Sequence, residues 1–196
     1  MKKKKRLAIF ASGTGSNAEN IIKYFRDHPS IEVFCLLCNK PDAPVIKSLE
    51  AYAIEIKIFN REDLYDSHEI KSYLDWYQID FIILAGFLWL LPENIIEDFP
   101  DRIINIHPAL LPAYGGKGMY GNKVHQAIIE NKDMETGISI HLVNEKFDEG
   151  KLLFQAKVPV AEDDTASTIA LKVRALEQAH FPRVIEEYLG ALGTGY

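Results

Sequence analysis

Cysteine is scarce in this sequence, with two residues among 196. A disulfide-rich scaffold is excluded, because small domains of that class need several bridges. Cys35 and Cys38 have the spacing of a redox or zinc pair, but the apolar run 31–38 that contains them predicts a strand. Residues three apart in a strand point to opposite faces, so we expect two unpaired core cysteines and no metal site. Such cysteines suit a reducing compartment, which predicts the cytoplasm.

Long apolar runs are also missing. The longest, Phe81 to Leu91, contains Gly86 and ends at Pro92, so it is too short to cross a membrane. The basic run 2–6 is not followed by the apolar region and cleavage site of a secretory signal. We therefore expect neither a membrane span nor a signal peptide.

Basic residues are fewer than acidic residues. The sequence has 22 basic and 28 acidic residues, so its formal net charge is −6. This balance argues against a protein that binds nucleic acid or a membrane surface. It allows a small anionic ligand, because a local group of donors can oppose the net charge. The composition, with 47% hydrophobic and 26% charged residues, and the length predict a single globular domain over 1–196. We expect this domain to be a monomer or a homodimer.

Apolar runs alternate with amphipathic segments along the chain. The predicted strands lie near 7–11, 31–38, 55–59, 80–85 and 102–107, and the predicted helices follow the turn 12–17, cover 45–52 and 66–77, and start at Pro92. This order predicts an α/β fold with a mostly parallel, Rossmann-like sheet and helices on both faces. Strands near 137–143 and 151–158 predict an antiparallel C-terminal addition, followed by a helix over 165–179 and a second short helix from Pro182.

The turn Ser12-Gly-Thr-Gly-Ser-Asn17 follows the first predicted strand and opens a helix. Gly13 and Gly15 permit positive φ and close backbone approach, and the helix N-terminus favours a phosphate. A dinucleotide site is disfavoured, because Asn39-Lys40 stands where an acidic residue should hold the ribose. A capping box formed by Ser16 and Glu19 is the alternative, since it would satisfy the same N–H groups without a ligand.

Asn105 and His107 are two apart in a short predicted strand, so both side chains point to one face. The carboxyl edge of a parallel sheet is where α/β folds bind ligands. An amide beside an imidazole can stabilise an oxyanion and transfer a proton. A core Asn and His satisfied by the backbone is the alternative.

Four motifs, in order and at suitable spacing, carry a family resemblance. They are Ser12-Gly-Thr-Gly-Ser-Asn17, Leu84-Ala-Gly-Phe87, Ile104-Asn-Ile-His-Pro108 with Leu110-Leu-Pro112, and Gly137-x-Ser139 through Asp148-x-Gly150. Over residues 6–189 the chain resembles the phosphoribosylglycinamide formyltransferases, a branch of the folate-dependent formyltransferases. The resemblance implies a phosphate-binding half near 6–100 and a folate-binding, catalytic half near 101–189.

The resemblance also implies a reaction. A formyl group would pass from 10-formyltetrahydrofolate, a co-substrate, to the amine of phosphoribosylglycinamide, with no tightly bound cofactor. Asn105 and His107 would stabilise the oxyanion, and Asp148 would assist His107 and proton transfer. A carboxylate near His107 favours the imidazolium, so we expect a raised pKa for His107.

Binding residues follow from the same resemblance. The ribonucleotide would contact Gly15, Ser16, Asn17, Arg174 and Glu177. The folate would contact Arg61, Leu88, Trp89, Leu90, Leu91, Asn105, Asn144, Glu145, Lys146, Phe147 and Asp148. A surface ion pair is the alternative for Arg174 and Glu177, and ordinary core is the alternative for Leu88–Leu91. Ala109 and Trp89 depart from the side chains of some relatives, and the Gly-rich stretch 114–121 suits a mobile lid.

Other functions compete with this hypothesis. A formyltransferase acting on another amine and a formyltetrahydrofolate hydrolase are alternatives that need no ribose phosphate site. A non-enzymatic nucleotide-binding module would keep the Gly-rich turn but would not need Asn105, His107 and Asp148 together.

Overall fold

The computed structural model describes residues 3–193 and divides the chain into two compact units, Met1–Asn105 and Ile106–Tyr196. In the described residues the strand order is β3-β2-β1-β4-β5-β6-β7. The α/β fold predicted from the sequence is confirmed, with a mostly parallel sheet and an antiparallel C-terminal pair. The predicted single domain with its two halves stays a prediction.

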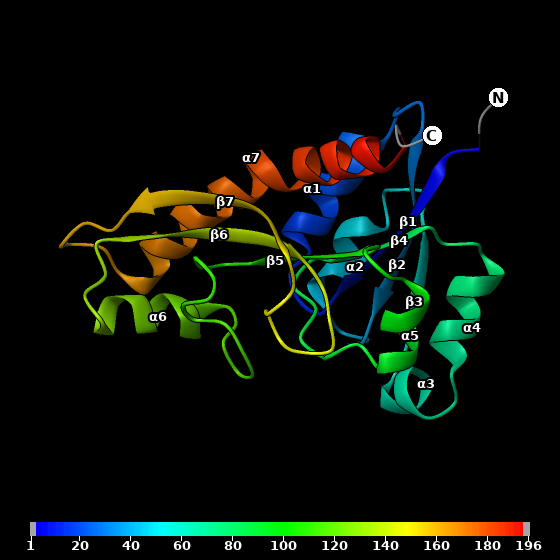
Figure 1. Ribbon diagram of the computed structural model, residues 1–196, viewed down its shortest axis with the longest axis horizontal. Helices are drawn as coiled ribbons and strands as arrows, with labels where there is room; N and C mark the ends of the chain where they lie inside the picture. The colour runs from blue at the N-terminus through cyan, green and yellow to red at the C-terminus, as the bar shows by residue number, and fades with distance from the viewer. Residues whose placement is uncertain (1–2, 194–196) are drawn as a thin grey trace. The chain divides into compact units, whose positions relative to one another are not determined.

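The first unit is built on parallel strands (Figure 1). Its strands are β1 (Lys5–Ala11), β2 (Ile31–Cys38), β3 (Glu55–Ile58), β4 (Phe81–Leu84) and β5 (Ile103–His107), the last of which ends beyond the unit boundary. The strand β1 lies between β2 and β4, and Leu7–Ala11 are fully buried. A strand covered on both faces has this continuous apolar sequence rather than an alternating one.

Helices connect these strands. They are α1 (Ser16–Phe25), α2 (Pro44–Leu49), α3 (Arg61–Tyr65), α4 (Glu69–Trp76) and α5 (Glu93–Asp98). The helix α1 buries Ile21, Ile22 and Phe25 on one face. The helix predicted near 66–77 is confirmed as α4, whereas the sequence analysis missed the short helix α3 before it. Asn60 begins α3 with a capping box, in which its side chain accepts from the Asp63 N–H and the Asp63 carboxylate accepts from the Asn60 N–H.

The second unit contains α6 (Asn122–Glu130), β6 (Glu135–Leu142), β7 (Leu152–Pro159) and α7 (Ala166–Gly193). The strands β6 and β7 pair antiparallel, and α7 packs against both of them and against α6 (Figure 1). The predicted second helix from Pro182 is wrong, because α7 runs through this residue. Proline removes one backbone hydrogen bond, but a buried stripe runs from Phe181, just before it, to Ile185 and Leu189 beyond it, so burial sustains the helix.

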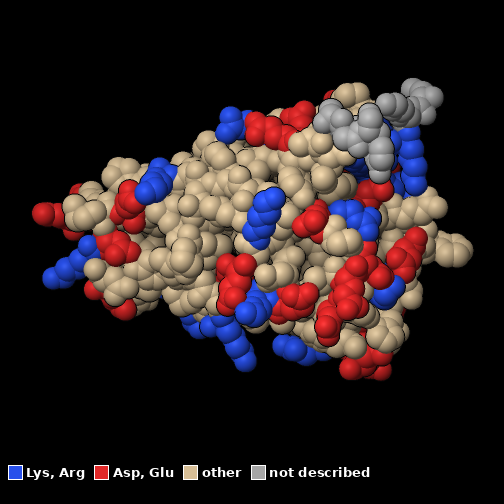
Figure 2. All heavy atoms as spheres, in the orientation of Figure 1, with Lys and Arg blue, Asp and Glu red and all other residues tan. Residues whose placement is uncertain are grey.

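Cys35 and Cys38 are buried and free, as predicted. Burial raises the pKa of the Cys35 thiol to about 12, so the reactive thiolate is strongly disfavoured. On the face drawn in Figure 2, acidic and basic side chains are interspersed. None of the helices in residues 3–193 combines the length and apolar character that a membrane crossing requires.

Candidate functional site

The turn between β1 and α1 has an uncapped helix N-terminus. Gly15 is the N-cap, with φ of 79°, and no side chain makes a capping hydrogen bond. A β-carbon on Gly15 would lie 2.2 Å from Val45 Cγ2, so both the backbone angle and the space require glycine. Because Gly15 has no β-carbon, a ligand can approach the backbone at the N-terminus of α1 closely, which is the property of an anion site.

The capping-box alternative for this turn is wrong. Ser16 is the first helical residue rather than the N-cap. The Glu19 carboxylate instead accepts a hydrogen bond from the Tyr52 hydroxyl at 2.8 Å and pairs with Lys23 at 2.8 Å. The side chain that would have satisfied the turn is thus engaged elsewhere, which favours the anion-site interpretation.

Ser12 joins this turn to the segment after β4. Its N–H donates to the Gly86 carbonyl, and its hydroxyl accepts from the Leu88 N–H, each at 3.1 Å. The predicted folate segment Leu88–Leu91 therefore starts beside the predicted phosphate turn. Leu88 is 36% exposed whereas Leu91 is 2% exposed, so only part of this segment is ordinary core.

Arg61 and Trp89, both predicted folate residues, lie against each other. The Arg61 guanidinium is 4.6 Å from the centre of the Trp89 ring, a cation–π contact. The Tyr65 hydroxyl donates to the Leu90 carbonyl at 2.7 Å and fixes the same segment. Trp89 thus holds Arg61 through its ring, a contact that the sequence did not predict.

Asn105 and His107 occupy β5, where Asn105 pairs with Leu84 of β4. Asn105 is half-buried and ends the first unit, and His107 is buried in the second. Their spacing of two residues places them on one face of this strand.

His107 and Asp148 come together in the second unit. His107 Nδ1 lies 3.5 Å from Asp148 Oδ2, and His141 Nε2 lies 3.6 Å from Asp148 Oδ1. The Gly116 N–H donates to Asp148 Oδ2 at 2.9 Å. Asp148 has φ of 57°, a left-handed conformation that is uncommon for a residue with a side chain and is characteristic of functional sites.

The pKa of His107 is lowered, so the expectation of a raised value is wrong in sign. Burial lowers the pKa, and the charge of His141 acts in the same direction. Asp148 and the Tyr114 carbonyl act to raise it, but burial outweighs them. The pKa of Asp148 is also lowered, because the His141 hydrogen bond, the His107 charge and the Gly116 N–H outweigh a burial effect that alone would raise it. At neutral pH the pair is a neutral imidazole beside a carboxylate.

The turn that carries Asp148 depends on Gly150. A β-carbon there would lie 1.7 Å from the Leu142 carbonyl oxygen, so no other residue fits. The other predicted folate residues, Asn144–Phe147, form the start of this turn, in which the Asn144 side chain accepts from the Lys146 N–H at 3.0 Å. Lys146 pairs with Glu149 on the surface.

A buried side chain, Ser139, and a half-buried one, Gln155, hold the connection after His107. The Ser139 hydroxyl donates to the Ala109 carbonyl at 2.7 Å and accepts from the Leu111 N–H at 2.9 Å. Gln155 Nε2 donates to the Leu111 carbonyl at 3.0 Å. Ala109 therefore contributes through its backbone. The sequence analysis did not single out Gln155. The only sign of its role was a polar residue among apolar ones in the strand β7.

Arg174 and Glu177 lie one turn apart on α7, where Arg174 is exposed and Glu177 is partly buried. Their assignment to the ribonucleotide stays a prediction. Within residues 3–193, no group of three or more His, Cys, Asp or Glu side chains is arranged to hold a metal ion.

Comparison with known proteins places this geometry in a family. Residues 5–185 match the formyl transferase family model. The chain is 38% identical to the chloroplastic phosphoribosylglycinamide formyltransferase of Arabidopsis thaliana, over 97% of this chain and 66% of that protein. It is 32% identical to the phosphoribosylglycinamide formyltransferase of Bacillus subtilis, over 97% and 98% of the two chains.

A solved structure agrees with these matches. The crystal structure of phosphoribosylglycinamide formyltransferase from Bacillus halodurans superposes with a TM-score of 0.84 at 34% identity, over 94% of this chain and 95% of that one. The chain spans 66% of the length of the Arabidopsis relative. The extent of the family match and the agreement in fold lead to one conclusion: the chain belongs to the formyl transferase family.

Proposed function

We propose that this protein transfers the formyl group of 10-formyltetrahydrofolate to the amine of 5-phosphoribosylglycinamide, a step of purine biosynthesis. The observation that carries the proposal is the pairing of a buried neutral imidazole, His107, with the Asp148 carboxylate in a member of the formyl transferase family. The helix N-terminus of α1, which begins at the glycine N-cap Gly15, supports a substrate that carries a phosphate.

The chemistry requires one bond to form and one to break. The amine nitrogen attacks the formyl carbon, the carbonyl becomes an oxyanion, and the bond from that carbon to N10 of the folate then breaks. The amine loses a proton and N10 gains one, so the reaction is balanced without an oxidant or a metal. Asn105, on the same face of β5 as His107, is assigned to donate its amide N–H to the oxyanion.

His107 is assigned the proton transfer. Its Nε2 lies 2.7 Å from the Tyr114 carbonyl, which only accepts, so Nε2 carries the proton and Nδ1 of the neutral ring is a base. When Nδ1 takes the amine proton, Asp148 stabilises the imidazolium. The positive charge of the imidazolium then stabilises the oxyanion, and the proton on Nδ1 is transferred to N10. His107 therefore stabilises the oxyanion only after it has accepted a proton.

The proposal also assigns residues to the binding of the two substrates. Gly15–Asn17 are assigned to the phosphate, and Arg174 and Glu177 to the rest of the ribonucleotide. Arg61, Leu88–Leu91 and Asn144–Asp148 are assigned to the folate. We place the reaction in the cytoplasm, which the two free buried cysteines support.

One assay tests the proposal. The protein is incubated with 10-formyltetrahydrofolate, with and without phosphoribosylglycinamide, and tetrahydrofolate release is followed. We expect release only with the ribonucleotide. Tetrahydrofolate release at the same rate with and without the ribonucleotide would identify a hydrolase. Release only with another amine would identify a different transferase. The absence of release under all these conditions would favour a nucleotide-binding module.

A further inference from the structure

The three-residue turn Tyr114–Gly116 contacts both members of the His107–Asp148 pair. The Tyr114 carbonyl accepts from His107 Nε2 at 2.7 Å, and the Gly116 N–H donates to Asp148 Oδ2 at 2.9 Å. Gly115 lies between them, and a β-carbon on it would approach Asp148 Cβ to 3.3 Å. Because both bonds come from one short turn, any shift of this turn moves the imidazole and the carboxylate relative to each other.

Tyr114 is held in an unfavourable backbone conformation. Its φ is 58°, in the left-handed region that is unfavourable for a residue with a β-carbon. Hydrogen bonds on its side chain oppose this strain. The phenol donates to Asp133 Oδ2 at 2.5 Å and accepts from Asn131 Nδ2 at 2.8 Å. Both partners lie between α6 and β6, so the phenol ties the turn to that connection.

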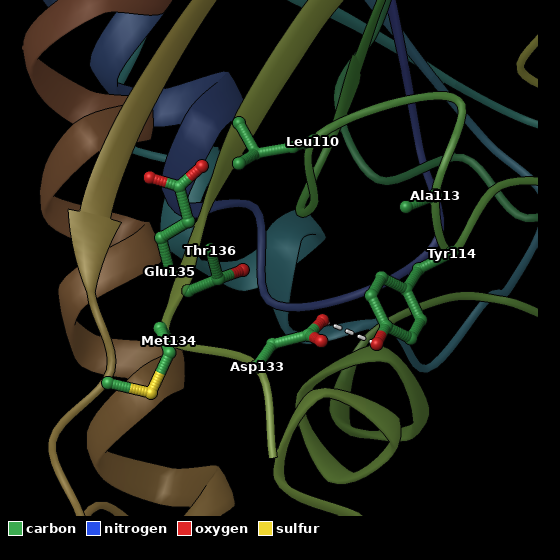
Figure 3. A pocket seen from close by; sticks show the side chains of 7 residues that line it. All are labelled: Leu110, Ala113, Tyr114, Asp133, Met134, Glu135 and Thr136. Atoms are coloured by element: carbon green, nitrogen blue, oxygen red, sulfur yellow. Dashed lines mark hydrogen bonds between the residues drawn. The ribbon is translucent and has the colours of Figure 1, made fainter. Parts of the chain in front are cut away.

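Packing alone does not hold this ring. Figure 3 shows that Tyr114 borders a cavity, with its hydroxyl directed at Asp133. The cavity has a volume of about 230 Å³, and its other lining residues include Leu110, Ala113 and Thr136. The ring has no packing contacts on the side that faces the cavity, so its hydrogen bonds contribute more to its position. The position of the turn therefore depends on the phenol, Asp133 and Asn131.

We infer that Tyr114 is a positioning residue: anchored by Asp133 and Asn131, its carbonyl fixes the imidazole of His107 in the Nε2–H tautomer, with Nδ1 directed at Asp148. The inference deepens the proposed function and rests on it for the effect on turnover, but not for the effect on the tautomer. If the turn relaxes, the Nε2–H loses its acceptor and the ring can rotate or exchange tautomers. The base that faces Asp148 is then present only part of the time.

The test is Tyr114→Phe in the full chain, which removes only the phenol oxygen. The ¹⁵N shifts of the His107 ring, assigned by comparison with His107→Gln, report the tautomer without any substrate. We expect the pure Nε2–H pattern in the wild type and a mixture in the variant. Turnover should fall about tenfold, the value of one hydrogen bond to an ionised group, with less change in KM. Tyr24→Phe, which removes an exposed phenol on α1, should leave both measurements unchanged.

A second pair of variants separates the hydrogen bond from a general loss of folding. Asp133→Asn keeps an oxygen that accepts from the phenol, and Asp133→Ala does not. We expect wild-type shifts in the first variant and the Tyr114→Phe pattern in the second. Wild-type shifts in both Tyr114→Phe and Asp133→Ala would overturn the inference. A mixed tautomer in these variants, in a protein that transfers no formyl group, would instead contradict the proposed function and leave the positioning role of Tyr114 standing.

Discussion

His107 Nδ1 and Asp148 Oδ2 lie 3.5 Å apart in a buried environment, and burial outweighs the carboxylate in setting the pKa of the ring. In the proposed mechanism, Asp148 therefore acts less on the resting imidazole than on the imidazolium that would form during the reaction. The proposed role of the carboxylate is thus to stabilise the imidazolium, even though the pKa of the resting His107 is lower than usual.

Replacing Asp148 by Asn is expected to reduce turnover by about a hundredfold or more, the range for a lost participant in proton transfer. The same change removes a charge that raises the pKa of His107, so the acid limb of the pH–rate profile should move to lower pH. Steady-state kinetics from pH 5 to 8 measure both effects. Glu149→Gln is the control, because Glu149 is exposed and pairs with Lys146 at the surface. Wild-type turnover in Asp148→Asn would remove this residue from the mechanism.

Introducing an acidic residue at the start of α1 should separate helix stability from phosphate binding. In Ser16→Asp, the carboxylate favours the positive end of the helix dipole and should leave stability unchanged or raise it by about 0.5 kcal/mol. The same charge repels a phosphate at the uncapped N–H groups, so the KM for the ribonucleotide should rise about tenfold while that for the folate changes little. Thermal melting measures the change in stability, and steady-state kinetics measure the KM values for the ribonucleotide and the folate. An unchanged KM for the ribonucleotide would place the phosphate elsewhere.

The sequence predicted the sheet and most of the elements because the signals were local. Apolar runs such as Leu7–Ala11 and the stripe at Ile169 and Val173 identify strands and helices directly. Where a local rule competed with burial, the prediction failed. Proline at 182 favours a new helix start, but the buried stripe on both sides keeps α7 continuous.

The motifs singled out His107 and Asp148, which the structure brings together, but they did not reveal the electrostatics of this pair. The sign of the His107 pKa shift depends on how deeply the ring is buried, which the spacing of Asn105, His107 and Asp148 does not reveal. The role of Tyr114 was also hidden, because its carbonyl and its phenol act on residues seven and nineteen positions away. Side-chain partners set by tertiary structure leave no periodic signal in the sequence.

Stability should fall as the pH drops below about 6.5, the usual histidine pKa. Burial lowers the pKa of His125, whose Nδ1 has no hydrogen-bond partner among the described residues. The unfolded chain then binds protons at a pH where the folded chain does not, so this contribution is fully present above pH 6.5 and is lost as the pH falls toward the folded pKa. Urea unfolding from pH 8 to 5 measures the slope. His125→Gln should flatten it, and an equal slope in the variant would show that His125 titrates alike in both states.

Gly150→Ala is expected to destabilise the protein by about 3 kcal/mol, because the new β-carbon would overlap the Leu142 carbonyl oxygen at 1.7 Å and force the backbone to move. The displaced turn carries Asp148, so turnover measured well below the unfolding transition should fall as well. Gly190→Ala is the matched control. Among the described residues, no atom outside the neighbouring helix backbone lies within 4 Å of a β-carbon at that position in α7. Alanine in a helix is favoured over glycine by about 1 kcal/mol, so this variant should be more stable. Equal stabilities for the two variants would mean that the turn at Gly150 relaxes freely and does not fix Asp148.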